Sequence, residues 1–189
     1  MAIGVLALQG DFAAHAAVLR RLGAVAREVR SCADLAGLDA LVLPGGESTA
    51  LLRLMAPEPW FDALRAFHDR GSALLGTCAG AILLASEVLK PPQDRLGLID
   101  ITIERNAYGR QVDSSIKAGE CPEVADHPVE MVFIRAPIIR RVGEGVRVLG
   151  RADGLPVLVE QEGVLAATFH PELTEDESVH RYFLRKLDH

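Results

Sequence analysis

The chain has 189 residues, of which 49% are hydrophobic and 24% charged, and its formal net charge is −6 at pH 7. This length and composition predict a single globular domain over residues 1–189 with a sizeable core. The acidic balance, without a dense Lys/Arg cluster, argues against nucleic acid as a partner. The first residues lack the basic start of a signal peptide, and the longest uncharged run, 71–86, is too short to span a membrane. We therefore expect a soluble, cytoplasmic protein.

The first half of the chain alternates short apolar segments with amphipathic ones. The apolar runs predict strands over 3–8, 25–29, 40–43 and 73–75. The segments between and after them predict helices over 11–22, 48–55, 59–69 and 79–89. Asp11 is the expected N-cap of the first helix, and the last is expected to end before Pro91. Such an alternation predicts a parallel sheet with helices on both faces.

The second half changes character. Its apolar runs predict strands over 98–104, 129–134, 146–151, 157–161 and 164–169. Asp153-Gly154 and Glu162-Gly163 are typical hairpin turns, so the last three of these strands should be antiparallel neighbours. An amphipathic helix is expected over 175–187. The predicted fold is α/β, with three layers and a mostly parallel, flavodoxin-like sheet that carries antiparallel strands in its C-terminal half.

Cys78 lies in the motif GTCAG, between an expected strand and an expected helix. G-x-C-x-G is the cysteine form of the nucleophile elbow, in which a tight turn lifts the nucleophile out of the sheet. The helix that follows would point its N-terminus at the sulfur and favour the thiolate. The alternative is a buried structural cysteine, which is common. Cys32 and Cys121 complete an odd count that argues against disulfides, and no C-x-x-C pair predicts a zinc or redox site.

His170 and Glu172 follow the strand expected over 164–169. In an extended segment they would project to the same side, so the carboxylate could hold the imidazole in one tautomer while the other ring nitrogen faces a thiol. A surface histidine in a turn is the alternative. That simpler interpretation is adopted for the remaining histidines, namely His15, His68, His127, His180 and His189.

The loop PGGES follows the strand expected over 40–43. It lacks the spacing of a phosphate-binding loop, and it could be a simple turn. Its glycines could also present backbone N–H groups to a developing oxyanion, together with the N–H of Ala79 after the cysteine. Glu47 could bind a substrate ammonium group. Because ligands bind at the carboxyl ends of strands in open α/β sheets, this loop should lie beside Cys78 and His170.

Taken together, these motifs resemble the class I (triad) glutamine amidotransferases, and among them the glutaminase subunits of bacterial pyridoxal 5′-phosphate synthase. The resemblance covers nearly the whole chain. It rests on the stretches GVLALQGDFAAH, LPGGEST, GTCAGAILLA, ERNAYGRQVDS, FIRAP and FHPELTED.

The resemblance implies a role for each matching residue. Cys78 would be the nucleophile, His170 the base and Glu172 its orienting carboxylate. The N–H groups of Gly46 and Ala79 would bind the oxyanion. L-Glutamine would be bound by Gly46, Glu47, Ser48, Arg105, Ile134 and Arg135. Gln9 and Gly45 would lie near the oxyanion site and the partner contact.

The implied reaction is hydrolysis of L-glutamine to L-glutamate and ammonia, without metal or cofactor. The ammonia would pass to a synthase partner that makes pyridoxal 5′-phosphate, in a hetero-oligomer. One alternative is a glutaminase that serves histidine or anthranilate synthesis. Another is a thiol sensor or binding module on the same fold, which would need a reactive Cys78 but neither His170 nor Glu172.

Overall fold

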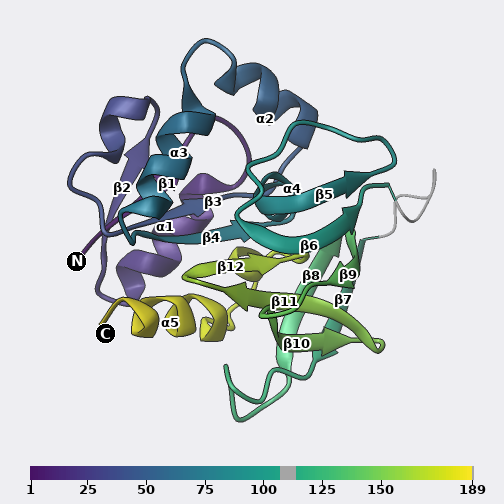
Figure 1. The fold of residues 1–189 in the computed structure, drawn as a ribbon. Coiled ribbons are helices and arrows are strands. Elements are labelled where there is room, and N and C mark those ends of the chain that lie inside the picture. The colour runs from purple at the N-terminus through teal and green to yellow at the C-terminus, as the bar shows by residue number, and fades with distance from the viewer. Residues whose placement is uncertain (107–113, 189) are drawn as a thin grey trace.

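The computed structural model describes residues 1–106 and 114–188 of the chain (Figure 1). Its helices are α1 (Phe12–Arg21), α2 (Ser48–Met55), α3 (Trp60–Asp69), α4 (Ala79–Leu84) and α5 (Ser178–Arg185). Short 3₁₀ turns are η1 (Cys32–Leu35), η2 (Pro171–Leu173) and η3 (Lys186–Asp188). Its strands are β1 (Ala2–Leu6), β2 (Val25–Val29), β3 (Ala40–Leu43), β4 (Ala73–Thr77), β5 (Ala85–Leu89), β6 (Ile99–Glu104), β7 (Ser114–Gly119), β8 (Val129–Ile134), β9 (Ile138–Val142), β10 (Arg147–Ala152), β11 (Leu155–Gln161) and β12 (Val164–Ala167).

Within this described part, seven strands form the main sheet in the order β10-β11-β12-β4-β3-β1-β2. The five strands from β12 to β2 are parallel, and β10 and β11 add an antiparallel edge. The order of the parallel strands is that of the flavodoxin-like doubly wound fold. The predicted α/β class, the mostly parallel sheet and the antiparallel C-terminal strands are therefore confirmed.

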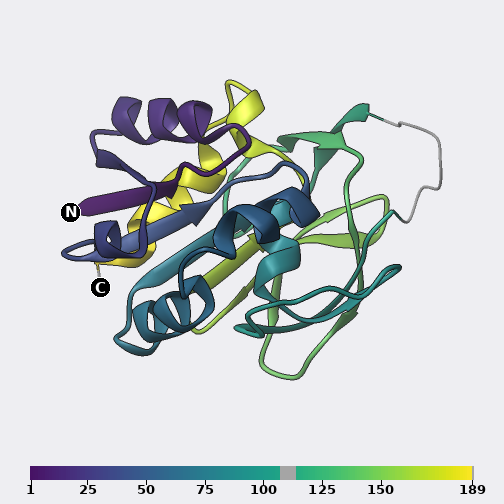
Figure 2. The ribbon, with the colours of Figure 1, turned by 90° about the horizontal axis from the view of Figure 1, so that it is seen from above.

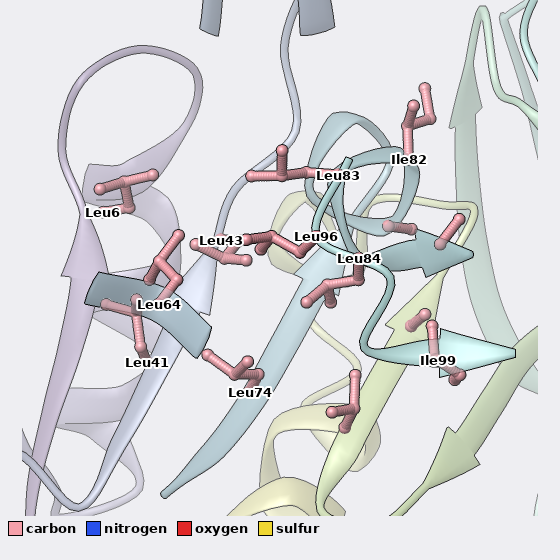
Figure 3. Packing of buried hydrophobic residues seen from close by; sticks show 14 of the residues in the cluster. Leu6, Leu41, Leu43, Leu64, Leu74, Ile82, Leu83, Leu84, Leu96 and Ile99 are labelled. Atoms are coloured by element: carbon pink, nitrogen blue, oxygen red, sulfur yellow. The ribbon is translucent and has the colours of Figure 1, made fainter. Parts of the chain in front are cut away.

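Helices cover both faces of this sheet (Figures 1 and 2). A hydrophobic core lies on each face of the sheet. Alternate residues of β3 belong to different cores, because successive side chains of a strand point to opposite faces. Leu41 and Leu43 pack with the residues of α2, α3 and α4, as Figure 3 shows for part of that core. Ala40 and Val42 pack with the residues of α1 and α5. The inner strands β3 and β12 are apolar throughout because both of their faces are buried, whereas the edge strand β2 carries the charged residues Arg27 and Glu28.

The prediction of a helix over 79–89 is wrong for the second half of that segment. The structure ends α4 at Leu84 and continues as β5, which pairs in parallel with β6. The carbonyl groups of Leu83 and Leu84 accept hydrogen bonds from Leu96 and Leu98, so the returning chain binds the end of the helix. A long-range contact therefore overrides the local helical pattern.

Besides β5, two further strands in the described ranges were not predicted. β9 pairs antiparallel with β6 in a three-stranded sheet with β5, and β7 pairs antiparallel with β8. The predicted hairpins are confirmed: β10-β11-β12 turns at Asp153-Gly154 and Glu162-Gly163, with positive φ at all four residues.

The bounds of α1 and α5 differ from the prediction, whereas α2 has the predicted bounds. α1 follows Asp11 as expected, but the Asp11 side chain makes no capping hydrogen bond. α5 begins at Ser178, later than predicted, and the carboxylate of Asp176, just before the helix, accepts from the Ser178 N–H. No helix in the described ranges is long and apolar enough to cross a membrane.

Candidate active site

Cys78 occupies the sharp turn between β4 and α4. Its backbone has φ +48° and ψ −103°, a conformation that side-chain-bearing residues rarely adopt and that typically costs about 1–3 kcal/mol. Its N–H donates to the Ala167 carbonyl of β12 at 2.8 Å, which ties the turn to the neighbouring strand.

The two glycines of the motif are required by close backbone packing at this turn. A Cβ on Gly80 would lie 2.0 Å from the Leu43 carbonyl oxygen, and one on Gly76 would lie 2.6 Å from the Gly80 carbonyl carbon. Both distances are far below van der Waals contact. The G-x-C-x-G spacing is therefore explained by the elbow itself, which a buried structural cysteine would not need.

His170 follows β12, and its N–H donates to the Val132 carbonyl at 2.8 Å. The residues after it form η2 rather than the extended segment that we expected. This turn still places Glu172 beside the ring, and His170 Nδ1 lies 2.8 Å from Glu172 Oε1. Both side chains are buried, with exposed fractions of 5% and 0%.

The environment of His170 favours its protonated form. Burial alone would lower its pKa, but the hydrogen bonds and charges of Cys78 and Glu172 outweigh burial and raise the pKa to about 10. The imidazole is therefore protonated at neutral pH, with the sulfur of Cys78 on one side and a carboxylate on the other. Such an arrangement can stabilise a thiolate and later donate a proton to a leaving group.

The other two cysteines lack such surroundings. Burial is the main cause that raises the pKa of Cys32 to about 11, with Glu58 adding to it. Burial and the charge of Asp176 raise the pKa of Cys121 to about 11. Both thiols are protonated at neutral pH, so neither is a candidate nucleophile.

The loop after β3 packs tightly against these side chains. A Cβ on Gly45 would lie 2.4 Å from His170 Cε1 and 3.2 Å from the Cβ of Cys78. On the other side of the loop, Gln9 Nε2 donates to the Gly45 carbonyl at 3.4 Å, and the Glu47 N–H donates to Gln9 Oε1 at 3.2 Å. Gly46 has φ +130° and a Cβ there would strike the Gln9 side chain. Gln9 thus holds the glycine loop beside the sulfur.

A cavity of about 290 Å³ opens above Cys78. Its lining includes most of the residues that the sequence pointed to, namely Gly46, Glu47, Ser48, Cys78, Arg105, Ile134, Arg135 and His170. Asp11, Ile82, Asn106 and Pro137 complete it. Glu172 lies behind His170, and Ala79 is fully buried as the first residue of α4. The part of the quoted ERNAYGRQVDS stretch from 107 to 113 lies outside the described residues.

Some of these side chains already have partners. The Glu47 carboxylate caps α2, accepting from the N–H groups of Thr49 at 2.9 Å and Ala50 at 2.7 Å, rather than standing free for an ammonium group. Arg105 donates to Thr49 Oγ1 at 3.1 Å and lies 3.6 Å from Glu47. Ser48 Oγ lies 2.8 Å from Gln93 Oε1. The cap fixes where α2 begins, and thereby the shape of the cavity wall.

Three of the six non-glycine residues with positive φ in the described ranges lie at the cavity. Cys78, Asn106 and Arg135 all have positive φ, and all three line it. Such conformations persist where the surrounding fold enforces them, and they are frequent at active sites. Their shared location supports the choice of this cavity as the site.

One group of metal-ligand atoms is found in the described ranges. Asp11, His170 and Glu172 offer ligand atoms that lie within 4.8 Å of one another. A cation there would compete with the hydrogen bond between His170 and Glu172. The expectation that the site works without metal stays a prediction.

Sequence reasoning missed His15. We expected His15 and His180 on the surface, and both are wholly buried. His15 Nε2 lies 3.3 Å from Glu172 Oε2, so this histidine belongs to the surroundings of the site. The only sequence signal was its position on the apolar face of α1, among alanines. His127 is exposed as expected, and His189 lies outside the described residues.

Comparison with known proteins agrees with this geometry. Residues 5–189 match the SNO glutamine amidotransferase family. A Thermus thermophilus protein named pyridoxal 5′-phosphate synthase subunit PdxT is 55% identical over 184 residues, which are 96% of this chain and 95% of the relative. A Deinococcus radiodurans protein of the same name is 53% identical, over 97% of this chain and 96% of the relative.

Solved structures give the same picture. A crystal structure of a glutamine amidotransferase superposes with a TM-score of 0.92 at 52% identity, over 99% of both chains. The structure of PurLQS from Thermotoga maritima superposes with a TM-score of 0.71 over 98% of both chains. At 17% identity the second likeness concerns the fold alone.

Proposed function

The chain belongs to the SNO glutamine amidotransferase family, and we propose that it is the glutaminase subunit of a pyridoxal 5′-phosphate synthase. It hydrolyses L-glutamine to L-glutamate and ammonia. The observation that carries this proposal is a line of three groups that begins at the cavity: the strained Cys78, the protonated His170 beside it, and Glu172 behind it, bonded to the other side of the ring.

The first half-reaction forms a thioester. The Cys78 thiolate attacks the carbon of the substrate carboxamide, and the carbonyl oxygen takes the negative charge. The N–H groups of Gly46 and Ala79 bind this oxyanion. His170 donates its proton to the amide nitrogen as the C–N bond breaks, and ammonia leaves.

The second half-reaction hydrolyses the thioester. His170, now neutral, removes a proton from water, and the resulting hydroxide adds to the thioester carbon. Collapse of this intermediate releases L-glutamate and restores the thiolate beside the protonated imidazole. Glu172 keeps the Nδ1–H of His170 directed toward itself in both half-reactions, so that Nε2 faces the reacting atoms.

Substrate recognition falls to the cavity walls. Arg105 and Arg135 offer the cationic groups that bind a carboxylate, and Ser48 offers a hydroxyl group. Ile134, half exposed at the end of β8, gives an apolar contact for the methylene groups of glutamine. Glu47 shapes the wall through its cap on α2 and balances the charge of Arg105.

The partner is a synthase subunit that uses the ammonia, and the complex is a hetero-oligomer in the cytoplasm. The two relatives named as subunits of pyridoxal 5′-phosphate synthase support this part of the proposal. We expect the loop after β3 to change conformation when the partner binds. Gln9 and Gly45 are placed to transmit that change, since the Gln9 side chain is hydrogen-bonded to this loop and a Cβ on Gly45 would touch His170.

The test measures glutamate release by the purified chain, with and without the synthase subunit. Cys78→Ala should abolish it, because removal of a nucleophile typically costs about six orders of magnitude. Cys32→Ala is the matched control and should keep the wild-type rate. Cys78→Ala in the complex should stop pyridoxal 5′-phosphate formation from glutamine, and added ammonium should restore it. A Cys78→Ala chain that keeps a tenth of the rate, or a wild-type chain that is inactive with its synthase, contradicts the proposal.

A further inference from the structure

His15 is a buried titratable residue that the mechanism above does not use. It lies on α1, and its side chain is 0% exposed. Its ring meets groups from three other elements. Nε2 lies 3.3 Å from Glu172 Oε2 of η2 and 3.2 Å from Thr77 Oγ1 of β4, and Nδ1 lies 2.8 Å from His180 Nε2 of α5.

Glu172 needs a donor on the side away from His170. Its Oε1 accepts from His170 Nδ1, but its Oε2 is buried and makes no hydrogen bond of full geometry with any described residue. A buried carboxylate oxygen without a donor is costly. The Nε2 of His15, at 3.3 Å, is the group placed to supply one.

The carboxylate determines the tautomer of His15. An ionised carboxylate only accepts hydrogen bonds, so the nitrogen that faces Glu172 must carry the proton. His15 Nε2–H then has two acceptors within reach, Thr77 Oγ1 at 3.2 Å and Glu172 Oε2 at 3.3 Å. Its Nδ1 is left as an acceptor, which the Nε2–H of His180 satisfies. The opposite tautomer would direct a nitrogen lone pair at an anionic oxygen.

The surroundings keep His15 in this neutral form. Burial, and then the charges of His180 and His170, lower its pKa well below the usual value. Burial also lowers the pKa of His180 to about 4, an effect that Glu177 opposes and Arg21 reinforces. At neutral pH both rings are uncharged, so the negative charge of Glu172 remains available to His170.

We propose that His15 is a positioning residue that donates to the second oxygen of Glu172, and so fixes the carboxylate that orients His170. The proposal rests on the glutaminase function proposed above and adds a fourth member to its catalytic line. His15 does not touch the substrate cavity, and it acts through Glu172 alone.

Two substitutions separate a hydrogen-bonding role from a packing role. His15→Leu fills similar volume without a donor, and His15→Gln keeps an N–H donor at similar reach. Leucine and glutamine have similar helix propensities, so the two substitutions should affect the local stability of α1 alike. Each variant is assayed as the full chain with its synthase, beside the surface control His127→Gln.

His15→Leu should lower kcat roughly tenfold with little change in KM, because a hydrogen bond to a charged group is worth that factor. His15→Gln should recover most of the loss. In a Glu172→Gln background, the same His15→Leu change should alter kcat by no more than about twofold, since the neutral amide offers no negative charge for His15 to position. The alkylation rate of Cys78 by iodoacetamide should follow the same pattern without any substrate.

Three results would overturn the proposal: a folded His15→Leu chain with the wild-type kcat, a His15→Gln chain no better than His15→Leu, or an equal loss in the Glu172→Gln background. If His15→Leu does not fold, His15→Asn replaces it, because its shorter side chain keeps the polarity but not the reach. A wild-type chain without glutaminase activity contradicts the function itself. An active wild type with a silent His15→Leu contradicts this inference alone.

Discussion

His180 should make the protein sensitive to mild acid. The residue is buried and neutral, and burial is the main cause that lowers its pKa from 6.5 to about 4. Between these two pH values the unfolded chain binds a proton at this site and the folded chain does not. The free energy of unfolding must therefore fall as the pH falls from 6.5 towards 4. Each pH unit in this window costs about 1.4 kcal/mol, so lowering the pH from 7 to 5 costs about 2 kcal/mol from His180 alone.

His180→Gln isolates this contribution. Glutamine cannot be protonated, but its amide can still donate to His15 Nδ1. We expect urea denaturation at pH 7 and pH 5 to show that the variant loses about 2 kcal/mol less stability than the wild type between the two. His127→Gln is the control of opposite sign, because the hydrogen bonds that its ring donates to Asp126 and Asp176 raise the pKa of the exposed His127. Parallel losses in the wild type and His180→Gln would refute the assignment of a neutral, buried His180.

Three further predictions concern the active site. His170→Ala should reduce glutamate release more than Glu172→Gln does, because the imidazole transfers the proton and the carboxylate only orients it; equal rates for Glu172→Gln and the wild type would remove Glu172 from the mechanism. Gly45→Ala should strongly reduce kcat in a chain that still folds, since its Cβ would lie 2.4 Å from His170 Cε1. A steady-state assay measures kcat, and circular dichroism checks that the variant folds. An unchanged kcat would show that the loop can move to accommodate the methyl group. The free chain should be a poor glutaminase that the synthase activates. The mechanism would be a loop peptide at Gly45-Gly46 that presents its N–H to the oxyanion only in the complex, and one such donor is worth roughly 10²–10³ in rate. Full activity without the partner would exclude this mechanism.

Features that depend on neighbouring residues alone could be predicted from the sequence. A tight turn at Cys78 needs glycines on both sides, and hairpins at Asp153-Gly154 and Glu162-Gly163 need residues that accept positive φ. Each of these features therefore produces a recognisable motif of a few adjacent residues. Apolar runs separated by amphipathic segments likewise indicated the parallel sheet. The topology of such a sheet then brought the GTCAG, PGGES and HPE motifs to one edge.

Features that depend on distant partners could not be predicted in this way, and they became visible in the folded chain. The segment 85–89 has a helical pattern but forms β5, because β6 offers it hydrogen bonds. Glu47 reads as a free carboxylate, yet it caps α2 beside Arg105. His15 reads as an ordinary surface histidine, but the fold buries it against His180, 165 positions away. A side chain's protonation and partners depend on what the sheet and its covering helices place around it, and residues that far apart leave no shared local pattern.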